Sequence, residues 1–184
     1  MAKALLLIDI QNDYFPGGAM ELVGSVDAGI KAGKLLELFR RRSLPVIHVQ
    51  HLSTRAGATF FIPGTAGAEM HPSVIPLEGE KVVVKNYPNS FKETFLLEEL
   101  RRLEVDQLVI AGMMTHMCID TTTRAAADLG FKCTLAHDAC ATRALSFGGV
   151  AVPAEQVQTA FIAALNGMFA TVLSVDEITS NLNS

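Results

Sequence analysis

The chain has 184 residues, of which 49% are hydrophobic and 18% are charged, and its formal net charge is -4. This length fits one domain, residues 1–184, with a sizeable core. The acidic balance and the lack of a basic patch argue against a nucleic-acid partner. The apolar run at 4–10 is too short to span a membrane. Three cysteines without a CxxC spacing, and no signal peptide, predict a cytoplasmic protein without membrane contact.

Apolar stretches and helical patterns alternate along the chain. In chain order they predict a strand at 3–10, a helix at 25–42, strands at 44–50 and 81–85, a helix at 92–102, a strand at 106–111, a helix at 119–129, a strand at 131–136, a helix at 153–166 and a strand at 169–173. This alternation indicates an α/β fold: a doubly wound, mainly parallel sheet of about six strands with helices on both faces. Loops are expected at 11–18, 51–79, 87–91 and 137–142, and the second is long enough to suggest a functional role.

Three residues that can carry chemistry stand at predicted strand ends. Asp9 closes the first strand, Lys85 closes the third, and Cys118 stands where the fourth strand passes into a helix. Ligands of open α/β sheets bind at the carboxyl ends of the strands. We therefore expect these three side chains, far apart in sequence, to meet at that edge.

An aspartate, a lysine and a cysteine together suit nucleophilic catalysis. The helix N-terminus favours loss of the thiol proton, so Cys118 is the expected nucleophile. Asp9 could accept that proton, the Lys85 ammonium could stabilise both anions, and N–H groups of the turn before Cys118 could bind a carbonyl oxygen. Each residue also has a structural interpretation: a buried small hydrophobe for Cys118, a loop brace for Asp9 and a solvated flank for Lys85.

Four short motifs occur in register along nearly the whole chain. They are Asp9-Ile-Gln-Asn-Asp13-Tyr-Phe after the first strand, Lys85 followed by Ser90-Phe91 and Thr94, the segment Gly112-Met-Met-Thr115-His-Met-Cys118-Ile, and Asp138-Ala139 after the next strand. In this combination the chain resembles the cysteine hydrolases of the isochorismatase-like superfamily.

This resemblance implies a catalytic triad of Asp9, Lys85 and Cys118 and a thioester intermediate that water hydrolyses. It also implies a non-proline cis peptide at Met113–Met114, which would turn the backbone N–H of Met114, together with that of Cys118, into an oxyanion hole. No cofactor is implied. Because members are commonly homo-oligomers whose neighbours help to close the site, we expect a dimer or larger homo-oligomer that acts on a small-molecule substrate.

The presence of Cys118 favours hydrolysis of a C–N bond in a small amide, ureido or carbamoyl substrate, which is the activity of a cysteine amidohydrolase. One alternative is an isochorismatase-type vinyl-ether hydrolase, because some isochorismatases lack the cysteine and use the aspartate. Another is a non-catalytic small-molecule-binding scaffold. A nucleotide site is disfavoured because no G-x-G-x-x-G follows the first strand.

Metal-ligand spacing is missing from the expected region. Nicotinamidases carry an Asp-x-His pair there, whereas this chain has His48 and His51, which would point to opposite faces of a strand. His71 does not complete a ligand set, so we expect no catalytic metal, and a metal near His51 or His71 stays an open alternative. Aromatic residues, a histidine and a methionine flank the presumed site and could line the substrate pocket: Phe15, Tyr87, Phe91, His116 and Met117.

Overall fold

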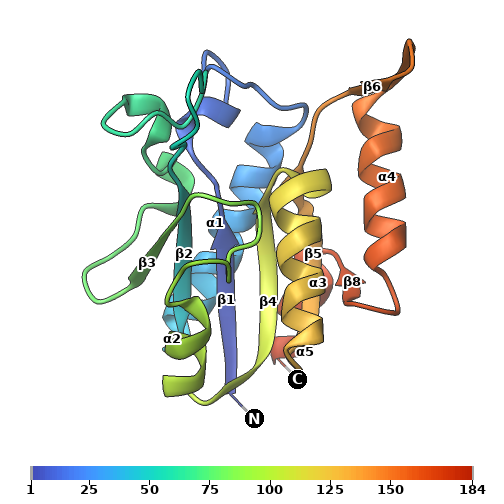
Figure 1. Cartoon of the computed structure of the whole chain (residues 1–184). Coiled ribbons are helices and arrows are strands. Elements are labelled where there is room, and N and C mark those ends of the chain that lie inside the picture. Colours follow the sequence, from blue (N-terminus) through green and yellow to red (C-terminus); the bar gives the residue numbers. More distant parts are fainter. Residues whose placement is uncertain (1, 184) are drawn as a thin grey trace.

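The computed structural model describes residues 2–183, so only the two end residues of the predicted domain lie outside it. Six strands form one parallel sheet with the order β3-β2-β1-β4-β5-β8. They are β1 (Ala2–Ile8), β2 (Val46–His51), β3 (Lys81–Lys85), β4 (Val105–Met113), β5 (Lys132–Ala141) and β8 (Thr171–Leu173). The predicted fold class is confirmed (Figure 1).

Helices cover both faces of this sheet. The helices are α1 (Ser25–Arg41), α2 (Leu96–Arg102), α3 (Asp120–Asp128), α4 (Ala154–Leu165) and α5 (Val175–Asn183). Residues of α1 and α5 share one apolar cluster with Leu5 and Leu7 of β1, whereas residues of α2, α3 and α4 share a second cluster with Leu6 and Ile8. Because successive side chains of a strand point to opposite faces, the continuous apolar run of β1 supplies both cores.

Several predicted element bounds are wrong. The helix expected at 92–102 begins only at Leu96, and the strand expected at 131–136 continues through most of the predicted loop at 137–142. It continues because pairing with β4 resumes at Gly112 and Cys140 after a bulge, which contains the polar residues that suggested a loop. Helix α5 and the hairpin of β6 (Leu145–Phe147) and β7 (Val150–Val152) were not predicted.

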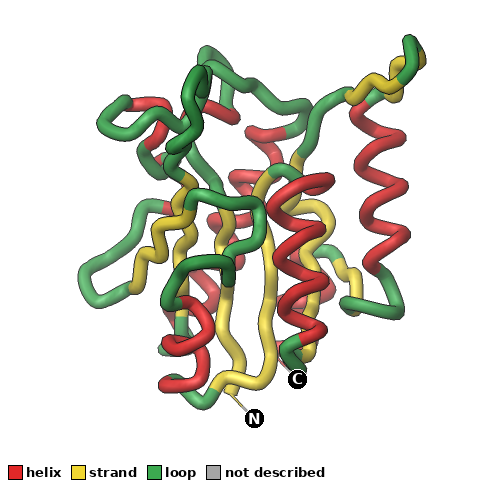
Figure 2. The backbone as a smooth tube through the Cα atoms, viewed as in Figure 1, coloured by secondary structure: helices red, strands yellow, loops and turns green. Residues whose placement is uncertain are grey.

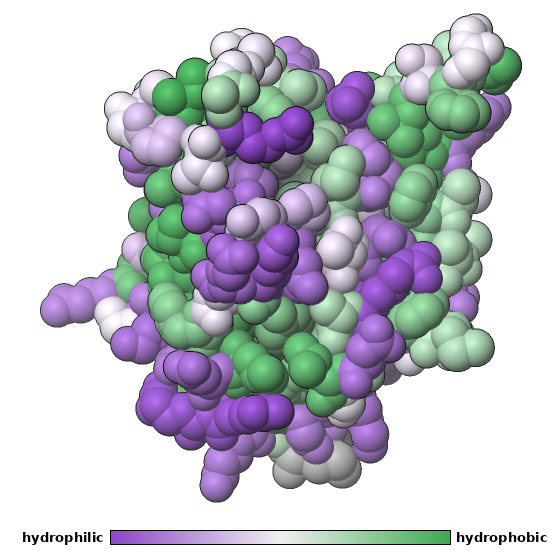
Figure 3. All heavy atoms as spheres, in the orientation of Figure 1, coloured by the Kyte–Doolittle hydropathy of each residue, from purple (hydrophilic) through white to green (hydrophobic). Residues whose placement is uncertain are grey.

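Long connections gather at the carboxyl ends of the strands, shown in green at the top of Figure 2. The long segment predicted as a loop, 51–79, begins here, includes two short 3-10 helices, Ala66–Ala68 and Pro72–Val74, and returns to the opposite edge, where β3 begins. The β6–β7 hairpin projects at the upper right in Figure 3, and its Phe147 side chain is 91% exposed. Within the part of the chain that the structure describes, no helix is long and apolar enough to cross a membrane.

Candidate active site

Four neighbouring strands each bring one reactive side chain to this edge. Lys85 is the last residue of β3, His51 is the last of β2, and Asp9 directly follows β1. Cys118 lies in a π-helical turn, Thr115–Ile119, that connects β4 to α3. The structure therefore brings Asp9, Lys85 and Cys118 together as expected, and it adds His51, which sequence reasoning had considered only as a metal ligand.

The Lys85 ammonium lies at the centre of this group. Its Nζ is 2.8 Å from Asp9 Oδ2, 3.2 Å from Cys118 Sγ and 3.0 Å from His51 Nδ1. A fourth contact, at 3.1 Å, is to the carbonyl oxygen of Tyr87. The side chains of both Lys85 and Asp9 are fully buried, so the ion pair compensates two charges that would be very costly alone.

The charges of the group are set by burial and by contact. Burial lowers the pKa of Lys85, but Asp9 and Cys118 raise it by more, so the net pKa lies above the ordinary value. Burial lowers the pKa of His51, which is therefore neutral near pH 7. A neutral imidazole can accept a hydrogen bond at Nδ1, which is the atom that faces the Lys85 ammonium.

The pKa of Cys118 differs from the expectation that a helix N-terminus would lower it. Burial raises the pKa of this thiol well above its usual value, and the nearby Asp9 carboxylate raises it further. Lys85 opposes both effects without outweighing them. The resting thiol is therefore protonated at neutral pH, and a nucleophilic thiolate requires a base that removes the proton.

Asp9 is placed to be that base. Its carboxylate and the sulfur of Cys118 offer atoms that lie within 4.8 Å of each other. Asp9 Oδ2 contacts the Lys85 ammonium at 2.8 Å, whereas Oδ1 has no hydrogen-bond partner among the described residues and keeps lone pairs free to take a proton. Asp9 also has a left-handed backbone with φ 53, an uncommon conformation that is found at functional sites.

The Asp-x-Gln-x-Asp motif holds the edge together. Gln11 donates hydrogen bonds to the carbonyls of His51 (2.9 Å) and Ala68 (2.7 Å) and accepts one from the His51 amide (2.8 Å). The buried Asp13 accepts from the Phe61 amide at 2.6 Å. Asp9 thus contacts Lys85, Gln11 fixes the end of β2, and Gln11 and Asp13 together hold the segment that follows β2 at Ala68 and Phe61.

The segment before Cys118 has the cis peptide implied by the resemblance, between Met113 and Met114. Gly112 precedes it with φ 137, and a Cβ there would collide with the carbonyl of Ile8 on β1, so only glycine fits. Thr115 Oγ1 donates to the carbonyl of Ala141 at 3.2 Å, which ties this turn to β5. The assignment of the Met114 and Cys118 N–H groups to an oxyanion hole stays a prediction.

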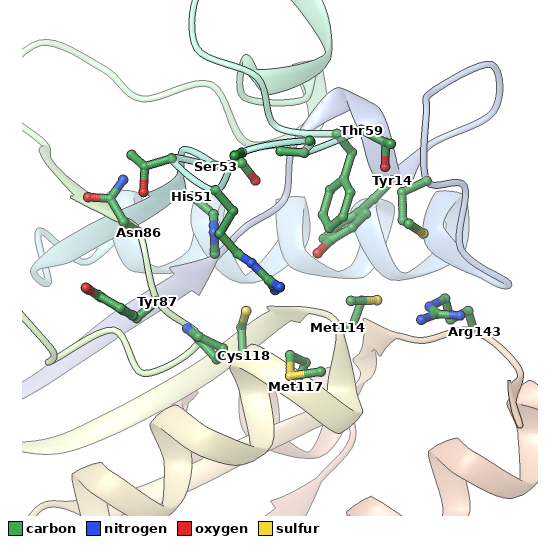
Figure 4. Close-up of a pocket in the computed structure, with 18 residues that line it drawn as sticks. Tyr14, His51, Ser53, Thr59, Asn86, Tyr87, Met114, Met117, Cys118 and Arg143 are labelled. Atoms are coloured by element: carbon green, nitrogen blue, oxygen red, sulfur yellow. The ribbon is translucent and has the colours of Figure 1, made fainter. Parts of the chain in front are cut away.

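A cavity of about 690 Å³ opens above the sulfur (Figure 4). Tyr87 and Met117, both predicted pocket residues, line it together with Met114 and Cys118. Its other lining residues are Tyr14, Met20, His51, Ser53, Thr54, Arg55, Ala56, Gly57, Ala58, Thr59, Phe60, Asn86, Pro88 and Arg143. The volume suits a small molecule.

Three predicted pocket residues do not line this cavity. Phe15 stacks on the ring of His71 at a centroid distance of 3.5 Å, and Phe91 stacks on Phe131 at 6.1 Å. His116 is buried, with Nδ1 2.6 Å from Thr142 Oγ1. Proximity in sequence to a motif did not determine which way these side chains point.

A metal site can be drawn from the same group. Asp9, His51 and Cys118 offer three ligand atoms within 4.8 Å of one another. The Lys85 ammonium contacts an atom of each residue, so a metal held by all three would have to displace it. His48 is separate, because its Nε2 lies 2.8 Å from Glu80. The expectation that no metal takes part stays a prediction.

Comparison with known proteins identifies the family. A family model described as an isochorismatase domain matches residues 3–177. The chain is 51% identical over 176 residues to an uncharacterized isochorismatase family protein, YddQ, of Bacillus subtilis, and the match covers 96% of this chain and 98% of YddQ. A crystal structure of an isochorismatase hydrolase from Oleispira antarctica superposes with a TM-score of 0.93 at 51% identity, covering 97% of this chain and 96% of that one. The chain belongs to the isochorismatase family.

Two further relatives have names that state an activity. A streptothricin hydrolase of Streptomyces noursei is 33% identical over 140 residues, which is 76% of this chain and 50% of that protein. Nicotinamidase 3 of Arabidopsis thaliana is 29% identical over 154 residues, covering 76% of this chain and 73% of the relative. The family, together with these relatives, supports a hydrolase.

Proposed function

We propose that the protein is a cysteine-dependent hydrolase that cleaves a C–N bond of a small amide, ureido or carbamoyl substrate. In this proposal Cys118 is the nucleophile, Asp9 is the general base, and Lys85 is the electrostatic partner of both. The observation that carries it is the single buried ammonium that contacts Asp9 Oδ2 at 2.8 Å and Cys118 Sγ at 3.2 Å.

The first half-reaction forms a thioester. Asp9 takes the proton of the Cys118 thiol while the sulfur attacks the carbonyl carbon, whose oxygen becomes negative. The N–H groups of Met114 and Cys118 would stabilise that oxygen, and such a donor typically contributes about 10²–10³ in rate. The tetrahedral intermediate collapses when the C–N bond breaks, and the nitrogen leaves with the proton from Asp9 as ammonia or an amine.

The second half-reaction restores the enzyme. Water attacks the carbonyl carbon of the thioester, or of the thiocarbamate formed from a ureido or carbamoyl substrate, and gives a proton to Asp9. The C–S bond breaks and releases a carboxylic acid or a carbamic acid, respectively. The sulfur then recovers its proton from Asp9, so that one water is consumed for each C–N bond. Lys85 keeps its proton throughout and compensates the carboxylate or the thiolate, whichever is charged, in agreement with its raised pKa.

The names of two relatives support the C–N chemistry. One is a nicotinamidase and the other a streptothricin hydrolase, and nicotinamide is a carboxamide. The cavity above the sulfur is large enough for a molecule of that kind, and its walls at Tyr87 and Met117 are partly apolar. An ether hydrolase that relies on the aspartate would not need the sulfur that Lys85 contacts.

The experiment is ammonia release from a panel of small carboxamides, ureido acids and carbamoyl amino acids by chelator-treated protein. We expect turnover by wild type, a loss of at least about 10³-fold in Cys118→Ser, and full activity in the control Cys133→Ser. Cys133 is a second free thiol, whose sulfur contacts the carbonyl of Phe131 and, among the described residues, no base or ammonium group. Full activity of Cys118→Ser, or pyruvate release from isochorismate without ammonia release from any panel member, would contradict the proposal.

Two further expectations from the sequence remain proposals. We propose that the chain forms a homo-oligomer, which sedimentation velocity tests by its mass in solution. We also propose a cytoplasmic location, with which three cysteines that form no disulfide are compatible. Fractionation of cells that produce the protein tests the location.

A further inference from the structure

The side chains that line the cavity give it a positive charge. Its lining residues include two arginines, Arg55 and Arg143, and no aspartate or glutamate among the residues that the structure describes. The Asp9 carboxylate beneath it is fully buried and paired with Lys85. An incoming molecule therefore meets two guanidinium groups and no accessible negative charge.

These two arginines differ from several others in the molecule. Arg40, Arg102 and Arg124 each pair with a carboxylate, at 2.7, 2.7 and 2.9 Å. Arg55 and Arg143 have no carboxylate partner within residues 2–183, and the Arg143 side chain makes one long hydrogen bond of 3.4 Å to the carbonyl of Ala144. Their five-donor guanidinium groups are thus available to a ligand.

Arg143 is the better positioned of the two. The preceding residue, Thr142, is buried, and its hydroxyl bonds His116 Nδ1 at 2.6 Å while its carbonyl accepts from the Val23 amide at 3.0 Å. The backbone at Arg143 is therefore fixed against the turn that carries Cys118. Both arginines are exposed, but Arg143 directly follows the buried Thr142, whereas Arg55 has exposed neighbours on both sides in the loop after β2.

The charge of Arg143 acts on two side chains near the reactive group, Tyr14 and His116. Burial, Cys118 and Asp9 raise the pKa of Tyr14, and Arg143 opposes them. Burial lowers the pKa of His116, and Arg143 lowers it further. The Arg143 guanidinium thus acts on Tyr14, a cavity-lining residue whose pKa the Cys118 sulfur also affects. Figure 4 shows Arg143 and Met114 on the same side of the cavity.

We propose that the substrate is an acid amide, carrying a carboxylate away from its scissile C–N bond, and that Arg143 binds this carboxylate. Guanidinium and carboxylate match in geometry and charge, and hydrogen bonds between ionised groups are stronger than neutral ones. This inference rests on the proposed function, because it assumes that the carbonyl to be attacked lies at Cys118. Arg143 would be a residue that determines specificity and leaves the chemistry to the buried group.

The experiment uses pairs of alkylating probes that differ only in charge: iodoacetate with iodoacetamide, and 3-bromopropionate with 3-bromopropionamide. Rates of modification at Cys118 are measured by peptide mass spectrometry in wild type, Arg143→Gln and Arg101→Gln. Arg101 is an exposed arginine on α2 that has no place in the cavity, so its variant removes the same charge elsewhere. Glutathione in the same solution gives the acid-to-amide rate ratio of an unassisted thiol.

We expect the acid-to-amide ratio at Cys118 to exceed that of glutathione for at least one probe length. Arg143→Gln should lower this ratio by about 10-fold and leave the amide rate unchanged, whereas Arg101→Gln should keep the wild-type ratio. A wild-type ratio equal to that of glutathione at both lengths, or an equal loss of both rates in Arg143→Gln, would overturn the inference while leaving the proposed chemistry standing. If even the amides modify Cys118 no faster than Cys133, the proposed function fails, and this inference fails with it.

Discussion

Strand β2 carries two histidines that belong to two different clusters of charged side chains. His51 faces the Lys85 ammonium at 3.0 Å, beside Asp9 and Cys118, under the cavity. His48 is fully buried and faces Glu80 at 2.8 Å. Asp9 and Lys85 are fully buried, and Glu80 and Arg40 are mostly buried with 14% and 26% of their side chains exposed. A shielded pair of carboxylate and cation therefore does not by itself distinguish a reactive site.

The carboxylates of the two clusters differ in how they are satisfied. Glu80 accepts from Arg40 at 2.7 and 2.8 Å, from His48 and from the Leu77 amide. These contacts overcome the effect of burial and lower the pKa of Glu80 to about 2. Asp9 Oδ2 pairs with Lys85 at 2.8 Å, whereas Asp9 Oδ1 has no hydrogen-bond partner among the described residues. A saturated carboxylate braces the fold, whereas an unsaturated one beside a thiol and a cavity can take a proton.

The largest effect should come from removing the central cation. Lys85→Met leaves Asp9 buried without a compensating charge, which should lower the free energy of unfolding by about 3–5 kcal/mol and abolish hydrolysis. Denaturant unfolding measures the first and ammonia release the second. Adding Asp9→Asn to Lys85→Met should restore most of the stability and none of the activity. Stability that is unchanged in Lys85→Met would contradict the central place given to this ion pair.

A second prediction separates thiolate formation from proton transfer. Because the Asp9 carboxylate raises the pKa of Cys118, Asp9→Asn should lower that pKa, and alkylation of Cys118 should set in at lower pH than in wild type. Hydrolysis should nevertheless fall by about 10²–10⁴-fold, since the base is gone. Peptide-resolved iodoacetamide labelling across pH 6 to 10 measures the shift, and the labelling curve of Asp9→Asn should lie at lower pH than that of wild type. Retained hydrolysis in Asp9→Asn would exclude Asp9 as the base.

A substitution in the Glu80 cluster should change the stability of the protein and leave its catalysis unchanged. Glu80 has a folded-state pKa of about 2 against an ordinary value of 4.5, so its stabilising effect is present above pH 4.5 and is lost as the pH falls toward 2. Glu80→Gln should lower the unfolding free energy at pH 7 by about 1–3 kcal/mol, and the difference from wild type should shrink below pH 4. Its kcat should stay at the wild-type level at temperatures where it is folded. A loss of kcat with unchanged stability would reverse the roles of the two clusters.

The smallest effects should distinguish two adjacent aromatic residues. Tyr14 lines the cavity, whereas Phe15 packs on His71 outside it. Tyr14→Phe should change kcat/KM by up to about 10-fold with little change in stability. Phe15→Leu should cost about 1–2 kcal/mol in unfolding free energy and leave KM unchanged. Steady-state kinetics and thermal unfolding of the two variants measure these effects. A change of KM in Phe15→Leu would indicate that Phe15 contributes to the substrate pocket after all.

Features of the fold and site that depend on residues close together in the sequence could be predicted from it, whereas features that depend on contacts between distant segments could not. The strands were predictable because each is a local apolar run, and Asp9, Lys85 and Cys118 follow from where those runs end. Helix α5 was missed although Ser174 and Glu177 form a reciprocal cap, with Ser174 N–H 2.7 Å from the Glu177 carboxylate and Glu177 N–H 3.2 Å from the Ser174 hydroxyl. The Ser-x-x-Glu spacing is a readable helix-start signal.

The rest of the site depends on packing between distant segments. His51 could have been found, because it ends the strand between those of Asp9 and Lys85. Arg55 and Arg143 could not, since loops with no periodicity bring them to the cavity wall. The pKa of Cys118 was expected in the wrong direction because the helix N-terminus is visible in the sequence, whereas the burial and the proximity of Asp9 that outweigh it are not.

The most direct test of the proposed mechanism is to trap the acyl-enzyme. Wild-type protein is quenched in acid during turnover of a panel amide, and peptide mass spectrometry locates any added acyl group. We predict an adduct on Cys118 that hydroxylamine removes, with none on Cys133 or Cys140, and ammonia released in step with its formation. Continued turnover without any adduct on Cys118, or an acyl group carried by another residue, would contradict the assignment of Cys118 as the nucleophile.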